Sequence, residues 1–243
     1  NNFKFIVFII LLLYQSPLYS KSNSLNNFNS KYLSNYFSGI VAYENQDNSQ
    51  ALKFFNSSKF LTDKHNPYLQ RYIYSLVLES KIQQAVNKLY QNLGNKNSDF
   101  FEAYLLLAID NIKKGKFKKS SRYLAQSKKF IKNDGFKKVI VGSLTQYIHV
   151  FDKKVIIKNK ANYGNLTYIN QTFQRCYLSD EKTDILFSQL INNDKDYSRY
   201  LYFYLGYLIE NERFEKAKNL TDQIEILNST ILISQGKQWI DEN

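Results

Sequence analysis

Three similar stretches recur along the first half of the chain at a nearly constant spacing. They cover residues 36–55, 72–90 and 104–124, and each has an apolar segment, a short polar break and a second segment that opens on a small residue. The small residues are Ala51, Ala85 and Ser120, which are separated by 34 and 35 residues. A period of this length fits one helical hairpin per repeat. The spacing therefore predicts an all-α fold built from antiparallel helix-turn-helix units, with an irregular helical bundle as the alternative.

The composition supports helices over strands. The chain has 243 residues, of which 44% are hydrophobic and 16% aromatic, so it can bury a substantial core. It contains only 2 prolines and 8 glycines. An all-β chain of this length would need turn residues about every 8–12 positions. The scarcity of turn residues favours helices that are joined by short polar connections.

The packing residues of these stretches resemble those of the tetratricopeptide repeat (TPR) family. The second helix carries a small residue followed four positions later by a large one, at Ala51 and Phe55, Ala85 and Leu89, and Ser120 and Leu124. The first helix has the matching small residue in two repeats, at Gly39 and Ala108, whereas Ile73 is larger than the family pattern. The resemblance implies a right-handed solenoid in which small residues let the paired helices approach closely.

A further hairpin is expected near the C-terminus, over residues 200–220, with Gly206 and Ala217 as its small residues. Between the hairpins, residues 136–151, 166–177 and 183–191 are expected to be helical. We expect a signal peptide at 1–20, a polar linker at 21–32, three TPR-like repeats at 33–133, degenerate helical repeats at 134–196, and the further hairpin plus the start of a next helix at 197–243. Because residues 230–243 form an amphipathic pattern without a polar cap, we expect the native chain to continue past Asn243.

The first twenty residues have the pattern of a secretory signal. Lys4 precedes an apolar run of ten residues from Phe5 to Tyr14, which is too short to span a bilayer, and Pro17 and Ser20 follow it. A buried first helix of the fold is the alternative. The pattern predicts an exported bacterial protein, with the periplasm as the expected compartment and membrane association left open. No transmembrane span is expected in the mature chain.

The sequence contains no recognisable catalytic or metal-binding set. Its only thiol is Cys176 and its only imidazoles are His65 and His149, and these residues lie far apart in the sequence. A nucleophilic pair must come within hydrogen-bond reach, and a zinc site requires several correctly spaced ligands. No glycine-rich phosphate-binding motif occurs either. We therefore expect a non-enzymatic protein without cofactors or metals.

The TPR resemblance implies a concave groove that is lined by the first helix of each hairpin and that captures a peptide. A mostly apolar set with tyrosines is expected there, which argues against the lysine and asparagine clamp for C-terminal carboxylates. The alternative is that these side chains pack against neighbouring helices. The expected groove residues are Tyr36, Ile40 and Tyr43 in the first repeat, Gln70, Tyr74 and Val77 in the second, and Glu102, Leu105 and Ile109 in the third.

A lysine-rich run covers residues 113–138 and supplies much of the net charge of +12. On a helix, Phe117, Ser120, Tyr123, Leu124, Ser127 and Ile131 gather on one side, and the charged residues gather on the other. The run is thus expected to be the solvated outer face of the third hairpin's second helix. The expected basic patch consists of Lys113, Lys114, Lys118, Lys119, Arg122, Lys129 and Lys132.

These features predict a scaffold of the cell envelope that binds a protein or peptide partner in a helical groove. The alternative is a basic helical module that binds an anionic membrane or envelope polymer through residues 113–138. Nucleic acid is an unexpected partner for an exported protein. A third possibility, an envelope enzyme, would require a catalytic module beyond Asn243.

Overall fold

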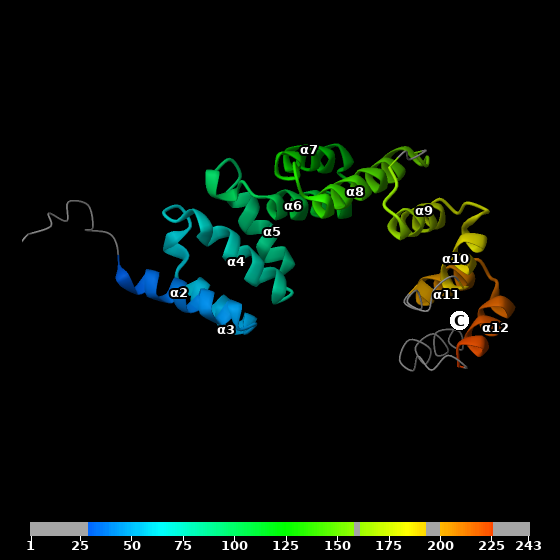
Figure 1. The fold of residues 1–243 in the computed structure, drawn as a ribbon, viewed down its shortest axis with the longest axis horizontal. Helices are drawn as coiled ribbons and strands as arrows, with labels where there is room; N and C mark the ends of the chain where they lie inside the picture. The colour runs from blue at the N-terminus through cyan, green and yellow to red at the C-terminus, as the bar shows by residue number, and fades with distance from the viewer. Residues whose placement is uncertain (1–28, 158–160, 193–199, 226–243) are drawn as a thin grey trace, which may run out of the picture. The chain divides into compact units, whose positions relative to one another are not determined.

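The computed structural model describes residues 29–157, 161–192 and 200–225, and this part of the chain is all-α (Figure 1). It divides into two compact units, residues 1–85 and 86–243. The boundary falls inside one helix, whereas the sequence pattern placed the boundaries between segments at 133 and 196. The expected signal peptide at 1–20 and the expected helix at 230–243 lie outside the described residues.

The first unit contains two helical hairpins. Their helices are α2 (Ser30–Glu44), α3 (Asn48–Ser57), α4 (Asn66–Leu78) and the start of α5 (Ile82–Gln91), with a 3-10 turn, η1, at Lys59–Leu61. Short polar side chains begin the first two helices: Asn29 accepts a hydrogen bond from the Lys31 N–H, and Asp47 accepts one from the Gln50 N–H. Since α2 begins at Ser30, the last three residues of the expected linker form its first turn.

Aromatic side chains fill the core of the first unit. Phe55 and Tyr68 are completely buried and Tyr36 nearly so, and their rings lie within 6.4 Å of one another. The hydroxyl of Tyr68 donates a 2.6 Å hydrogen bond to the Phe55 carbonyl, which ties α4 to α3. Gly39 lies directly against the Phe55 ring, since a Cβ atom there would be 2.9 Å from Phe55 Cε1. The close approach of α2 and α3 therefore depends on the absence of a side chain at Gly39.

The second unit contains the rest of α5 and seven further helices within the described residues. Their bounds are α6 Phe101–Lys113, α7 Phe117–Ser127, α8 Gly135–Lys153, α9 Asn165–Tyr177, α10 Thr183–Asn192, α11 Leu201–Glu210 and α12 Phe214–Glu225, with 3-10 turns η2 at Lys96–Ser98 and η3 at Lys128–Phe130. The expected helices at 136–151, 166–177 and 183–191 are confirmed, with shifts of two residues or fewer at their ends.

Five connections between consecutive helices share one turn conformation. In each, a residue with positive φ follows the first helix: Gln46, Ser80, Gly115, Ser179 and Glu212. The next residue donates its N–H to the carbonyl five positions earlier, at 2.8–3.0 Å. This 6→1 hydrogen bond is the defining feature of the Schellman motif, which satisfies carbonyls at a helix end. The chain therefore reverses direction in the same way at α2–α3, α4–α5, α6–α7, α9–α10 and α11–α12.

The shared turn also fixes where the following helix begins. In four of the five connections the residue that makes the 6→1 bond also accepts a hydrogen bond, through its carbonyl, from the N–H four positions later. The donors are Ala51, Ala85, Ser120 and Ala217, which are the small residues that the sequence pattern identified. All four are completely buried. A small side chain is thus placed at the same point of each hairpin, one turn into the second helix.

The α6–α7 hairpin shows why serine can stand at this small position. The Ser120 hydroxyl donates a 2.8 Å hydrogen bond to the carbonyl of Ala108, and both residues are completely buried. A polar group that is buried without a partner would be destabilising, but this hydroxyl is satisfied by the backbone of the neighbouring helix. Serine at this point therefore joins the two helices without separating them.

The helix that contains the lysine run is shorter than the sequence pattern indicated. Helix α7 ends at Ser127, and Lys128–Phe130 form the 3-10 turn η3. The expectation that Lys129, Ile131 and Lys132 continue the same helix is therefore wrong. The Ser127 hydroxyl bonds back to the Leu124 carbonyl, and Asp134 then begins α8 by accepting a hydrogen bond from the Lys137 N–H. Such local side-chain bonds favour helix ends over continuation.

Helix α8 is joined to α9 by polar contacts. Buried Asn170 donates a 2.9 Å hydrogen bond to the Ser143 hydroxyl, and Gln174 donates one to Gln146. The remaining helices, α9 to α12, enclose a separate apolar core in which Phe187, Tyr204 and Leu205 are buried. No helix in the described parts of the chain is both long enough and apolar enough to cross a membrane.

Candidate interaction surfaces

The expected groove residues of the first unit lie on α2 and α4, which contact each other. Tyr36 is only 3% exposed, and its ring packs against Phe55, Tyr68 and the His65 imidazole. Burial raises the pKa of the Tyr36 hydroxyl. The expectation that Tyr36 faces a ligand is therefore wrong, because its side chain belongs to the aromatic core.

The other groove residues of the first unit are half-buried and thus partly accessible. They are Ile40, Tyr43, Gln70, Tyr74 and Val77. Two polar contacts hold this surface in place: the Gln70 amide donates a 2.7 Å hydrogen bond to the Tyr74 hydroxyl, and the Arg71 guanidinium lies 5.3 Å from the centre of the Tyr43 ring. These contacts fix the tyrosines, so the surface is an ordered apolar strip with polar edges.

The expected groove residues of the third repeat lie in the second unit, on α6. Glu102 and Leu105 are half-buried, and Ile109 is 45% exposed. The nine expected residues are thus divided between the two units. Each unit has a partly accessible surface on the first helix of its hairpins.

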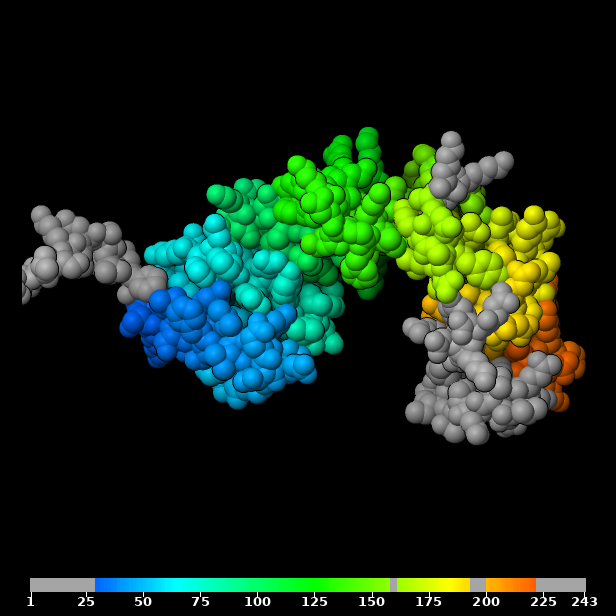
Figure 2. All heavy atoms as spheres, in the orientation of Figure 1, coloured from blue at the N-terminus to red at the C-terminus, as the bar shows by residue number. Residues whose placement is uncertain are grey.

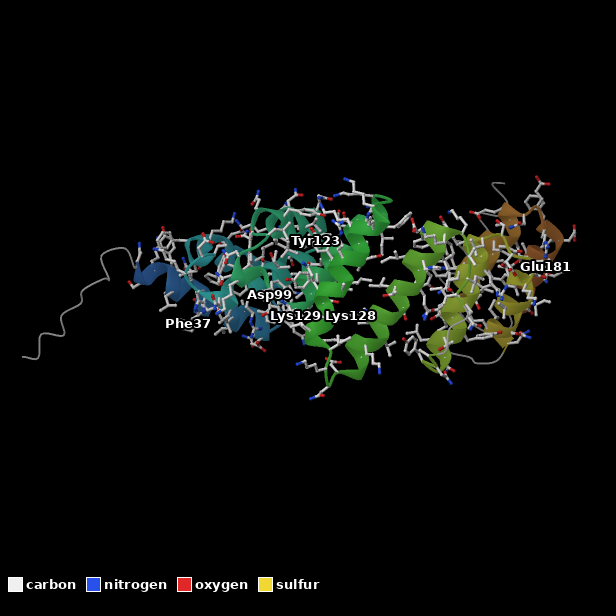
Figure 3. The ribbon with its side chains drawn as sticks, turned by 90° about the horizontal axis from the view of Figure 1, so that it is seen from above. Phe37, Asp99, Tyr123, Lys128, Lys129 and Glu181 are labelled. Atoms are coloured by element: carbon white, nitrogen blue, oxygen red, sulfur yellow. The ribbon has the colours of Figure 1, made fainter. Side chains whose placement is uncertain are left out.

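A second apolar surface in the first unit was not expected from the sequence. Phe37 is 55% exposed and Val41 is 61% exposed, one turn apart on α2. They line an open hollow whose other walls are Ser34, Ser38, Ala42, Asn45, Asp47, Gln50 and Phe54. Figure 2 shows α2 and α3 as one block of contacting atoms, and Figure 3 labels Phe37 on α2. The spacing of Phe37 and Val41 is the sequence signal that could have revealed this second apolar stripe.

The basic patch is exposed at every expected position, although Lys129 and Lys132 lie beyond the end of α7: Lys113, Lys114, Lys118, Lys119, Arg122, Lys129 and Lys132. Two of these lysines are paired with acids. Lys114 is 2.7 Å from Asp110, and Lys129 forms an ion pair with Asp99 (Figure 3). Within the described residues, Lys113, Lys118, Arg122 and Lys132 form no ion pair. The patch therefore keeps a net positive charge on its outer side.

The acid that pairs with Lys114 belongs to a polar network under the patch. Asp110 is 8% exposed and also accepts a 2.9 Å hydrogen bond from the Tyr90 hydroxyl, which in turn accepts one from Asn111. Burial raises the pKa of Asp110, but the bonds from Lys114 and Tyr90 outweigh it and hold the pKa below its ordinary value. Burial together with the Asp110 bond raises the pKa of Tyr90 to about 12. The network joins α5 to α6 in the second unit and is structural.

A similar pair stands beside η3. Asp99 accepts a 2.7 Å hydrogen bond from the Tyr104 hydroxyl in addition to its contact with Lys129. The Lys129 and Tyr104 hydrogen bonds lower the pKa of Asp99, and burial followed by the Asp99 bond raises the pKa of Tyr104 to about 12. The acid remains ionised at neutral pH, so it neutralises one lysine of the patch.

The three residues considered for catalysis belong to different elements of the fold. His65 lies in the first unit, against the Tyr36 ring, whereas His149 and Cys176 lie in the second. Cys176 is half-buried beside the α9–α12 core, and burial raises the pKa of its thiol, which disfavours the nucleophilic thiolate. Within the described residues, no three His, Cys, Asp or Glu side chains form a group that could hold a metal ion.

Comparisons with protein-family models, with curated proteins and with solved structures give no match for this chain.

Proposed function

We propose that this chain is a non-enzymatic scaffold of the cell envelope, built as a right-handed solenoid of TPR-like hairpins, that binds a protein or peptide partner on the first helices of its hairpins. The observation that carries the proposal is the recurrence of one turn at Gln46, Ser80, Gly115, Ser179 and Glu212. The first three are 34 and 35 residues apart, and the last two are 33 apart. Repetition of one hairpin at this interval is the basis of helical-repeat binding scaffolds.

The accessible surface of α2 and α4 supports a peptide as the ligand. Its side chains combine aliphatic groups, Ile40 and Val77, with tyrosines whose orientation is fixed by Gln70 and Arg71. Ordered aromatic residues with a polar handle are favoured at protein interfaces, because they bury a large area with little loss of conformational freedom. The location in the envelope rests on the signal pattern of residues 1–20.

The test is a pull-down from a cell-envelope fraction with the full chain as bait. We expect the wild-type chain to retain one protein in stoichiometric amount. The double variant Tyr43→Ser and Val77→Ser should not retain this protein, and the control variant Ile185→Ser should retain it. Ile185 is 58% exposed on α10, so its substitution changes exposed apolar surface elsewhere. Circular dichroism must show unchanged helix content in both variants.

Two outcomes would overturn parts of the proposal. Retention by the Tyr43 and Val77 variant would show that another surface binds the partner. Repeated failure to recover any stoichiometric protein under mild conditions would contradict the scaffold function itself.

A further inference from the structure

Phe136 is the most exposed large hydrophobic residue among the described parts of the chain. Its side chain is 75% exposed, more than Val41, Val155 or Ile185. It is the second residue of α8, in the first turn of the helix, directly after Gly135. An isolated exposed apolar residue needs no special explanation, but this one has several lysines close to it in the sequence.

Five lysines surround Phe136 in the sequence, at positions 128, 129, 132, 137 and 138. Four of them are exposed, and Lys137 is half-buried. The turn η3, which carries Lys128 and Lys129, contacts α8. Phe136 therefore belongs to a segment of the chain that is rich in exposed lysines.

The acids of this region cancel only part of its positive charge. Asp99 forms an ion pair with Lys129. Asp134 accepts a 3.0 Å hydrogen bond from the Lys137 N–H, and the Lys137 ammonium lies 3.4 Å from its carboxylate. Lys128, Lys132 and Lys138 make no ion pair with any described residue. From residue 86 to residue 138 the sequence has thirteen lysines and arginines against four acids.

We propose that the start of α8 docks on an anionic lipid surface, with the Phe136 ring inserted at the headgroup boundary and with Lys128, Lys132 and Lys138 bound to lipid phosphates. An aromatic ring gains by leaving water for the headgroup region, and each nearby lysine is attracted to the negative surface. A soluble polyanion would satisfy the lysines but offers no apolar layer for the ring. The combination of ring and lysines thus favours lipid over polymer.

The proposed docking site lies in the second unit, whereas the proposed peptide-binding residues of α2 and α4 lie in the first. Of the basic residues, those on α7 would strengthen attraction at longer range, since their charges act over about 8–10 Å at physiological ionic strength.

The test places a tryptophan at the proposed insertion point of the full chain. In Phe136→Trp, we expect fluorescence quenching by vesicles of brominated phosphatidylcholine that contain 30 mol% phosphatidylglycerol, and no added quenching without phosphatidylglycerol. The wild-type chain has a single tryptophan, Trp239, and supplies the background signal. Phe37→Trp is the matched control, because Phe37 is also an exposed phenylalanine but lies on α2.

Two further variants separate the ring from the charges. Phe136→Ala should lower the partition coefficient for anionic vesicles about tenfold, whereas Phe136→Leu should stay within about threefold. The triple change of Lys128, Lys132 and Lys138 to Gln should lower it about a hundredfold at low salt, because each lysine near an anionic surface contributes about fivefold. Raising the salt to 0.5 M should abolish the Phe136→Trp quenching.

The proposal is overturned if Phe136→Trp is quenched no more than the wild type and Phe37→Trp. It is also overturned if the chain binds long-chain polyphosphate in a salt-dependent way but shows no quenching by anionic vesicles, which would identify a purely electrostatic polymer binder.

Discussion

Because Gly39 lies against Phe55, the residue at position 55 should decide whether a mutation of Gly39 stabilises or destabilises the fold. A Cβ atom at position 39 would lie 2.9 Å from Cε1, 3.0 Å from Cδ1 and 3.2 Å from Cζ of the Phe55 ring. The ring cannot move away easily, because Phe55 is completely buried between Tyr36 and Tyr68. Substitution of Gly39 by alanine must therefore displace either the ring or the helix.

Two opposing contributions determine the result of Gly39→Ala. Overpacking of a core destabilises by about 1–3 kcal/mol, whereas replacing glycine by alanine inside a helix stabilises by about 1 kcal/mol. We expect a net loss of roughly 1 kcal/mol in the wild-type background. In a Phe55→Leu background the clashing ring is absent, so the same substitution should stabilise by up to about 1 kcal/mol. The coupling between the two sites is then about 2 kcal/mol, within the range found for residues in contact.

The measurement is a double-mutant cycle in urea, read by hydrogen exchange of peptides from residues 30–78 so that it reports on the first unit. Gly135→Ala is the matched control, read by exchange of peptides from residues 135–153, because a Cβ atom there meets nothing within 4 Å. It should change stability by less than about 0.5 kcal/mol. If Gly39→Ala has the same effect in both backgrounds, the close approach of α2 to Phe55 does not explain the glycine, and the packing argument is refuted.

Three further perturbations test other parts of the fold. Gly115→Ala should destabilise the fold by about 1 kcal/mol, and Ser80→Gly should stabilise it by a similar amount, because both positions have positive φ, which favours glycine. Effects of the same sign in urea unfolding would contradict this. Ser120→Val should destabilise by more than about 1 kcal/mol in thermal unfolding, but Ser120→Ala by less, since alanine fits the same small space. Burial raises the pKa of Asp184, but hydrogen bonds from Lys216 and Tyr204 hold it below its ordinary value of 3.8. As pH falls, the carboxylate of Asp184 is therefore protonated in the unfolded chain before it is protonated in the folded chain. Its contribution to the free energy of unfolding is complete above about pH 5 and is lost as pH falls through the folded pKa. Asp184→Asn should flatten the dependence of stability on pH below about pH 5, and an unchanged dependence in acid titration would contradict this.

The sequence predicted the helices well because their evidence is local. The spacing of Ala51, Ala85 and Ser120 located three hairpins, and each of these residues is buried at the same point of its hairpin. The end of α7 was missed, because Ser127 and Asp134 end and begin helices through side-chain bonds that do not interrupt the periodicity. The shared turn was also missed, since only Gly115 among its five positive-φ residues is a glycine.

The candidate surfaces were harder to predict, because exposure depends on which neighbours a helix has. Tyr36 fits an apolar stripe on α2 as well as Ile40 and Tyr43 do, and only the packing of Phe55 and Tyr68 against it shows that it is buried. The stripe of Phe37 and Val41 has the same helical spacing, but among the described residues no neighbour buries it. Periodicity assigns residues to a face, and tertiary contacts decide whether that face is core or surface.

The basic patch contains residues that form ion pairs within the fold and residues that form none. Lys114 and Lys129 are paired with Asp110 and Asp99, and each lies beside a tyrosine ring, so the hairpin uses both charges. Within the described residues, Lys118, Arg122 and Lys132 make no ion pair, and the hydroxyl of Ser120 bonds to the Ala108 carbonyl. Exposed charges of this kind contribute little to stability. The packing of the hairpin therefore does not require a positive charge at these three positions.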